Sequence, residues 1–263
     1  MLHHGVGGNF YGTRFYDELE RLLLAQGYAV IRANNRGHDL MYNSPKGRLG
    51  AAYEDVDDCR RDWRAWIDFA EREGYGSVML IGHSLGAVKT IHYLANEEDR
   101  RVQCAVAISP PRFCFEDYKA KPGGERFIEY YERAMAMVNS GNAGGLLEVD
   151  IPTNVVLSAR TYVDKYGPAD RYDIIRHLRN TRLPILVTIG SEEDIGLASP
   201  EFFAFGGLTQ VLQGLSRELA QLSFELIQGA DHMYTTRAVE LWAAIYSWLQ
   251  RTQPTEVIGR GVS

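Results

Sequence analysis

The chain has 263 residues, of which 45% are hydrophobic and 24% charged, and its formal net charge is −6. These proportions are ordinary for a globular protein and exclude a disordered or fibrous chain. The acidic balance lacks the basic face that nucleic-acid binding requires, and no apolar run approaches the ~20 residues of a membrane span. The first residues lack the apolar stretch of a signal peptide, and the three widely spaced cysteines predict reduced thiols, so we expect a cytoplasmic protein.

Strand-like apolar runs alternate with amphipathic stretches in the first half of the chain. This alternation predicts a mostly parallel, doubly wound sheet with helices on both faces, which is the α/β fold class. The expected helices cover 13–26, with Thr13 as a cap, 53–73 and 87–95, and the expected strands cover 28–33, 77–81 and 104–108.

The alternation of strand-like and helical segments stops between residues 110 and 180, where few strand signals occur. This segment has a helical stretch around 125–138, a Gly/Asn-rich joint at 140–145 and a second helical region that ends near Asn180. The alternation then resumes, with strands expected at 185–189 and 224–227 and a terminal helix at 238–250. We interpret 1–109 and 181–263 as one α/β core and 110–180 as an inserted helical cap or lid.

The strongest local motif is Gly82-His83-Ser84-Leu85-Gly86. It follows an expected strand and precedes an expected helix, which is the context of a G-x-S-x-G nucleophile elbow. In such a turn the serine has a strained backbone, and side chains two residues before or after it would clash, so both flanks are glycine. The motif therefore predicts Ser84 as a nucleophile.

With this motif the sequence resembles the α/β-hydrolase family, and three further segments agree with the resemblance. His4–Asn9 resembles the family's oxyanion loop, Asn35–Asp39 a segment after the next strand, and Gly229–His232 the turn that carries the catalytic histidine. The resemblance implies an oxyanion hole formed by the backbone N–H groups of Val6 and Leu85. Because the loop begins at residue 4, we expect the usual leading edge strands to be absent.

The resemblance also implies a general base and an acid that orients it. His232 follows an expected strand and precedes the terminal helix, so it should lie at the carboxyl edge of the sheet, where ligands bind in open α/β folds. For the acid, the family's register favours Glu193, while residue type favours Asp194. Glu116 and Asp117 form a weaker alternative.

The inserted segment is rich in aromatic residues, most of which should form its own small core. Some of them should instead line an apolar pocket over Ser84. The aromatic residues concerned are Phe113, Phe115, Tyr118, Phe127, Tyr130, Tyr131, Tyr162, Tyr166 and Tyr172. This composition favours a substrate with a hydrophobic or aromatic part.

These features predict a serine hydrolase that cleaves carboxylic esters through an acyl-enzyme intermediate, without a metal or other cofactor. One alternative function is a hydrolase with the same fold that cleaves a thioester, lactone, amide or C–C bond. Another is a non-catalytic binding protein, although such a protein need not keep the serine, histidine and acids. A haloalkane dehalogenase is disfavoured because it needs a carboxylate where Ser84 stands. The expected partners are a small-molecule ester and, at most, a second copy of the chain in a homodimer.

Overall fold

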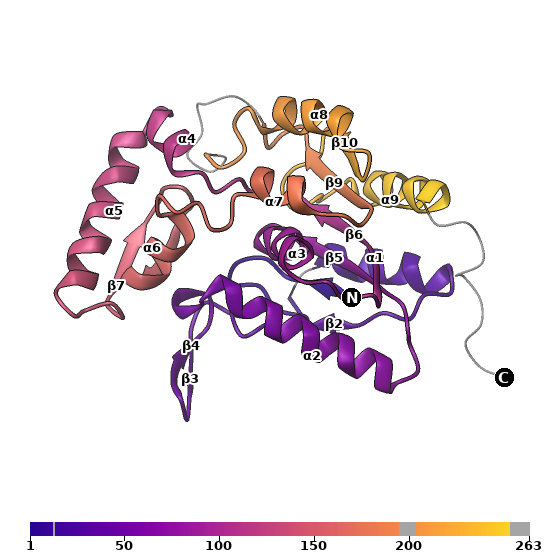
Figure 1. The fold of residues 1–263 in the computed structure, drawn as a ribbon, viewed down its shortest axis with the longest axis horizontal. Helices are drawn as coiled ribbons and strands as arrows, with labels where there is room; N and C mark the ends of the chain where they lie inside the picture. Colours follow the sequence, from indigo (N-terminus) through magenta and orange to yellow (C-terminus); the bar gives the residue numbers. More distant parts are fainter. Residues whose placement is uncertain (13, 195–202, 253–263) are drawn as a thin grey trace.

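The centre of the molecule is a six-stranded sheet, described by a computed structural model that covers residues 1–12, 14–194 and 203–252 (Figure 1). Its strands are β1 (Leu2–His3), β2 (Arg32–Ala33), β5 (Val78–His83), β6 (Val102–Ile108), β9 (Ile185–Gly190) and β10 (Leu222–Ile227). They run in the order β10-β9-β6-β5-β1-β2, and every neighbouring pair is parallel. The predicted parallel α/β sheet is confirmed, and its edge strands are β10 and β2.

Helices cover both faces of this sheet, as the alternating sequence pattern predicts. They are α1 (Arg14–Ala25), α2 (Cys59–Arg72), α3 (Leu85–Asn96), α7 (Ile174–Asn180), α8 (Leu208–Glu218) and α9 (Ala238–Thr252). Helices α1 and α9 share one buried cluster, and α2, α3, α7 and α8 share another on the opposite face. The sheet thus forms the middle of three layers.

Strand β6 shows why the predicted strands read as continuous apolar runs. Ala105 and Ala107 belong to the buried cluster on one face of the sheet, whereas Cys104, Val106 and Ile108 belong to the cluster on the other. Successive side chains of a strand point to opposite faces. Because helices cover both faces, both sets of side chains must be apolar.

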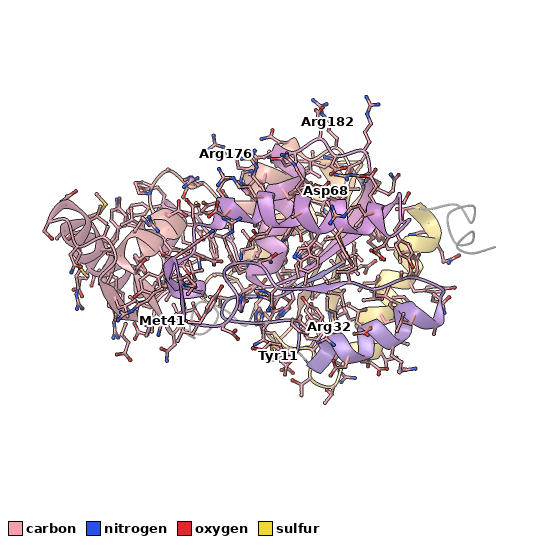
Figure 2. The ribbon with its side chains drawn as sticks, turned by 90° about the horizontal axis from the view of Figure 1, so that it is seen from below. Tyr11, Arg32, Met41, Asp68, Arg176 and Arg182 are labelled. Atoms are coloured by element: carbon pink, nitrogen blue, oxygen red, sulfur yellow. The ribbon has the colours of Figure 1, made fainter. Side chains whose placement is uncertain are left out.

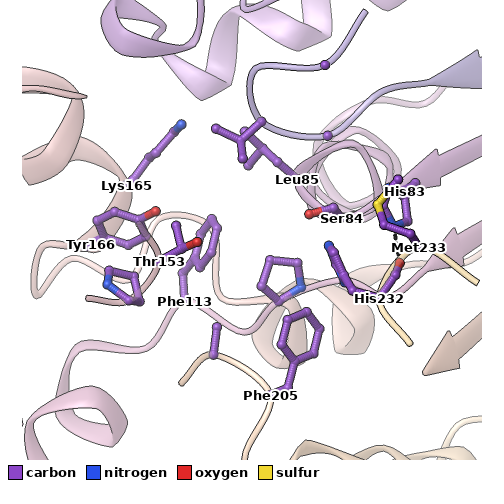
Figure 3. A pocket seen from close by; sticks show the side chains of 16 residues that line it. His83, Ser84, Leu85, Phe113, Thr153, Lys165, Tyr166, Phe205, His232 and Met233 are labelled. Carbon is purple, nitrogen blue, oxygen red and sulfur yellow. Dashed lines mark hydrogen bonds between the residues drawn. The ribbon is translucent and has the colours of Figure 1, made fainter. Parts of the chain in front are cut away.

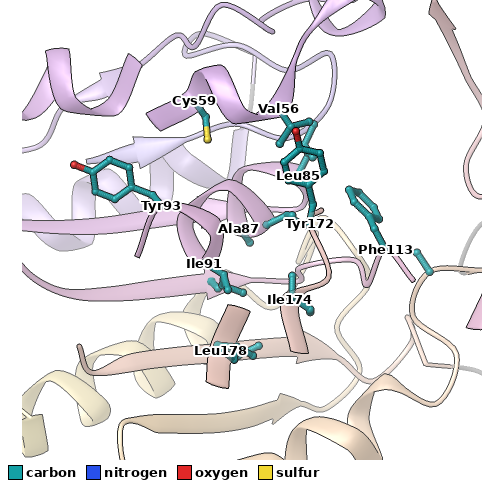
Figure 4. Close-up of a cluster of buried hydrophobic side chains, with 14 of the residues drawn as sticks. Val56, Cys59, Leu85, Ala87, Ile91, Tyr93, Phe113, Tyr172, Ile174 and Leu178 are labelled. Carbon is teal, nitrogen blue, oxygen red and sulfur yellow. The ribbon is translucent and has the colours of Figure 1, made fainter. Parts of the chain in front are cut away.

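Helix α3 follows the serine motif and is buried along its length. Every residue from Leu85 to Leu94 is buried. Figure 4 shows Ile91 of this helix beside Ile174 and Leu178 of α7. A helix that is covered on all sides is a core element, and it gives the residue at its N-terminus a rigid support.

The segment between β6 and β9 extends to one side of the sheet (Figure 1). It contains α4 (Phe115–Ala120), α5 (Gly124–Asn139), β7 (Leu146–Val149), β8 (Val155–Ser158), α6 (Ala159–Tyr166) and α7. The antiparallel β7–β8 hairpin was not expected, because few strand signals occur in this segment. Its inward side chains Leu147 and Leu157 are buried in the cluster they share with α5 and α6, so long-range packing stabilises it.

Several predicted boundaries were wrong. The helix expected from residue 53 begins only at Cys59, after two short 3-10 turns, because the Asp55 side chain caps the second turn by accepting from the Asp57 N–H. The strand expected at 28–33 is reduced to β2. Helix α8 and a hairpin formed by β3 (Tyr42–Ser44) and β4 (Gly47–Leu49) were not predicted. Thr13, the expected cap of α1, lies outside the described residues.

Charged side chains cover the outer surface of the helices. Figure 2 shows Arg176 of α7 and Arg182, two residues beyond this helix, extending outward. Arg182 pairs with Glu98 at 3.1 Å, but both side chains are more than four-fifths exposed, so the pair adds little stability. Within the residues that the structure describes, no helix has the length and apolar character needed to cross a membrane.

Candidate active site

Ser84 lies in the turn between β5 and α3, with backbone angles φ 55° and ψ −124°. This conformation is strained for any residue with a side chain. Glycine at both flanks makes the turn sterically feasible: a Cβ at Gly82 would clash with the Gly86 carbonyl, and a Cβ at Gly86 would clash with the His3 carbonyl. The sequence motif therefore folds into the sharp strand-to-helix turn that it predicts.

The loop after β1 runs against Ser84. A Cβ at Gly5 would lie 2.9 Å from the Ser84 Cβ, so only glycine allows this approach. The next residue, Val6, lines the same cavity as Ser84. Leu85 is the first residue of α3, where a backbone N–H has no acceptor within the helix. The two predicted oxyanion-hole residues, Val6 and Leu85, thus line the same cavity as Ser84.

Residues 35–39 hold this loop in place. The Asn35 N–H donates to Nε2 of His4 at 3.2 Å, and the Asn9 side-chain amide donates to Asp39 Oδ1 at 2.6 Å. Burial lowers the pKa of His4 to about 4, so its ring is neutral and can accept this bond at Nε2. The segment singled out after the second strand is therefore a brace for the loop beside Ser84.

His232 and Glu193 form a close pair at the carboxyl edge of the sheet. Nδ1 of His232 lies 2.5 Å from Oε1 of Glu193, whose side chain is fully buried. The other oxygen, Oε2, accepts from the Ser109 hydroxyl at 2.5 Å and from the Gly190 N–H at 2.6 Å. Figure 3 shows a ring nitrogen of His232 pointing toward Ser84. Because both oxygens of the carboxylate are held, it fixes the orientation of the imidazole.

The other candidate acids have different partners. Asp194 accepts from the N–H groups of Gly207 and Thr209 at the start of α8. Glu116 and Asp117 lie on α4, where their partners are Lys119 and Lys121. Of the four acids, Glu193 is the one that the structure brings to His232.

Sequence reasoning did not assign a site role to three neighbouring side chains. His83 lines the cavity and contacts the His232 carbonyl through Nε2 at 2.8 Å. Burial lowers the pKa of His83 to about 3, so its ring is neutral, and Nε2 must carry the proton because a carbonyl only accepts. Ser109 supports Glu193 and is in turn contacted by the Tyr234 hydroxyl at 3.0 Å. The one available signal was the position of Ser109 directly after a strand.

A cavity of about 460 Å³ lies over Ser84 (Figure 3). Its walls are mainly apolar, as predicted, but of the nine aromatic residues of the inserted segment only Phe113 and Tyr166 line it. The lining residues are Gly5, Val6, Gly8, His83, Ser84, Leu85, Pro111, Phe113, Pro152, Thr153, Lys165, Tyr166, Ala204, Phe205, His232 and Met233. Most of the other aromatic residues pack into the core of the inserted segment, as Tyr118 and Phe127 do.

In the described part of the chain, no three histidine, cysteine or acidic side chains gather closely enough to hold a metal ion. The arrangement at the cavity is a hydroxyl, an imidazole and a buried carboxylate. Such a set can deprotonate the hydroxyl and stabilise the imidazolium that results.

Comparison with solved structures shows the same fold in known hydrolases. Est1E from Butyrivibrio proteoclasticus, solved with ferulic acid bound, is similar with a TM-score of 0.65 and 16% identity, over 95% of this chain and 87% of that chain. A monoacylglycerol lipase from Paleococcus ferrophilus is similar with a TM-score of 0.65 and 18% identity, over 96% and 93%. E-2-(acetamidomethylene)succinate hydrolase is similar with a TM-score of 0.56 and 21% identity, over 95% and 90%.

No curated protein matches the chain. The family model described as "Alpha/beta hydrolase family" matches residues 1–245, which is most of the sequence. This match agrees with the parallel sheet, the strained serine turn and the histidine–carboxylate pair at the sheet edge. The chain belongs to the alpha/beta hydrolase family.

Proposed function

We propose that the protein is a serine hydrolase of carboxylic esters, with Ser84 as nucleophile, His232 as general base and Glu193 as the acid that orients it. The observation that carries this proposal is the contact between His232 Nδ1 and the fully buried Glu193 carboxylate, beside a serine in a strained turn. Esterases and a lipase among the structures of similar fold support ester cleavage.

In the proposed reaction, Ser84 Oγ attacks the acyl carbon while its proton passes to Nε2 of His232. The N–H groups of Leu85 and Val6 stabilise the negative charge that develops on the carbonyl oxygen. His232 then donates the proton to the leaving alcohol, and the ester C–O bond breaks. Water, deprotonated by His232, attacks the acyl-serine, which releases the acid and regenerates Ser84.

We propose further that residues 110–180 form a cap on the core made by 1–109 and 181–263. This segment supplies six residues to the lining of the cavity, namely Pro111, Phe113, Pro152, Thr153, Lys165 and Tyr166. The apolar lining favours a substrate with a hydrophobic or aromatic part.

The test is hydrolysis of a short activated ester by Ser84→Ala, with Ser216→Ala as the matched control. Ser216 lies on α8, which does not line the cavity. Losing the nucleophile of a triad costs roughly 10⁴- to 10⁶-fold in kcat, so Ser84→Ala should be inactive while the control keeps wild-type activity. More than a tenth of wild-type activity in Ser84→Ala would refute the assignment. A wild-type protein that hydrolyses no ester would favour the non-catalytic binding protein.

A further inference from the structure

Two lysines and one glutamate are buried together where the inserted segment meets the core. Lys89 Nζ lies 2.8 Å from Glu54 Oε2, and Lys165 Nζ lies 2.7 Å from Glu54 Oε1. All three side chains are at most 2% exposed. Burial alone would raise the pKa of Glu54, but the two ammonium groups lower this pKa to about 2. Glu54 is therefore an anion that two cations share.

The charges of this cluster do not balance, because two ammonium groups share one carboxylate. Burial, together with the nearby Lys89 ammonium, lowers the pKa of Lys165. The neighbouring carboxylates that also attract these ammonium groups are Asp62 and Asp164. Asp62 pairs with Arg36 at 2.6 Å, and Asp164 is engaged by Arg171 and by the Tyr172 hydroxyl. A buried charge without a counter-charge is costly, so an additional anion near the cluster would stabilise it.

The cavity over Ser84 gives such an anion a place. Lys165 lines its wall together with Tyr166 and Thr153, and in Figure 3 these three lie across the cavity from Ser84 and His232. Within the described residues, neither the Tyr166 nor the Thr153 hydroxyl has a protein hydrogen-bond partner. An ammonium group has three N–H donors, and among the described residues the contact with Glu54 Oε1 is the one ion pair that Lys165 makes.

We propose that the substrate of this enzyme is an ester that also carries a carboxylate remote from the scissile bond, and that Lys165, Tyr166 and Thr153 bind this carboxylate. The inference rests on the proposed ester hydrolysis and narrows its substrate class. The carboxylate would accept hydrogen bonds from the ammonium group and the two hydroxyls, and would balance the surplus charge of the buried cluster. The apolar walls would contact the hydrocarbon part that joins the carboxylate to the ester.

The test compares esters in matched pairs. In the first pair the free carboxylate is on the acyl part of the ester. The para-nitrophenyl monoester of a straight-chain dicarboxylic acid is compared with the neutral para-nitrophenyl ester whose acyl chain has the same number of carbons. In the second pair the alcohol part carries the carboxylate: the acetate ester of para-hydroxybenzoate is set against that of para-hydroxybenzamide. We expect wild type to show a higher kcat/KM for the acidic ester in at least one pair, after subtraction of spontaneous hydrolysis.

Lys165→Met should lower this preference about tenfold or more, because a hydrogen bond from a charged donor is lost. The preference is a ratio measured on one preparation, so partial unfolding of the variant does not change it. Tyr166→Phe and Thr153→Val remove only a hydroxyl and should each lower the ratio several-fold. Lys119→Met removes the same charge from the exposed surface of α4 and should leave the ratio unchanged.

The outcomes separate this inference from the proposed function. No hydrolysis of any ester refutes the proposed function. Hydrolysis of neutral esters without a preference for either acidic ester refutes the inference alone. A preference for the acidic ester that persists in Lys165→Met also refutes the inference. The buried cluster would then serve only as a set of ion pairs that joins the inserted segment to the core.

Discussion

The carboxyl edge of the sheet and the inserted segment 110–180 both border the cavity, but they acquire their structure differently. Ser84 directly follows β5, Glu193 lies three residues beyond β9, and His232 lies five residues beyond β10. Parallel strands end at one edge, so strand order alone brings these side chains together. The wall opposite Ser84 depends instead on contacts between distant segments, such as Lys165 with Glu54. The comparison suggests that the edge determines the chemistry, whereas the inserted segment determines which substrate fits.

Apart from the loss of Ser84 itself, the largest effect is expected for Glu193→Gln, which tests the chemistry of the edge. The amide leaves the geometry nearly intact but favours the wrong tautomer of His232, so we expect kcat to fall on the order of 10⁴-fold. The measurement is steady-state hydrolysis of an activated ester, with folding checked by circular dichroism.

The matched control is Asp194→Asn, one residue along the chain. Asp194 holds two N–H groups at the start of α8, so its loss should cost about 1 kcal/mol of stability and leave activity within a few-fold of wild type. An active Glu193→Gln enzyme would show that another group orients His232.

The sequence predicted the parallel sheet, Ser84 and His232 because each rests on a local pattern with a defined position at a strand end. It could not choose between Glu193 and Asp194, because adjacent residues leaving a strand face different ways and a small shift of the loop exchanges them. Ser109 and Tyr234 support Glu193 only through tertiary contacts, which leave no local motif. The β7–β8 hairpin and the Lys165–Glu54 pair were missed for the same reason.

A smaller effect is expected in the pH dependence of stability, through His83 at the edge. Burial lowers the pKa of His83 to about 3 in the folded protein, below the unfolded value near 6.5, so the unfolded state binds the extra proton between these values. Its contribution to stability is therefore present above pH ~6.5 and lost as the pH falls.

Urea unfolding at pH 7 and pH 5 measures this loss, with His83→Gln as the comparison because Gln keeps a donor for the His232 carbonyl. Between these two pH values wild type should lose about 2 kcal/mol more stability than the variant. Parallel losses in both proteins would mean that His83 does not gain its proton on unfolding.

The smallest effect tests the inserted segment through Phe113→Ala. Phe113 is buried at the cavity wall and packs edge-to-face on Tyr166 with ring centroids 5.1 Å apart. Losing this apolar surface should raise KM about tenfold for esters with a large hydrophobic part, and much less for acetate esters. Phe69→Ala, on the exposed surface of α2, should change neither value. An equal fall in kcat for all esters would mean that the inserted segment takes part in the chemistry.

The most direct test of the central claim is to label the protein with a fluorophosphonate probe and map the modified residue by mass spectrometry of its peptides. The probe bonds covalently to an activated serine hydroxyl and releases fluoride. We expect one label, on the peptide that contains Ser84, and none when the Glu193→Gln or Ser84→Ala variant is treated for the same time. A label on another residue, or none on the wild-type protein, would contradict the claim that the strained turn after β5 carries the nucleophile.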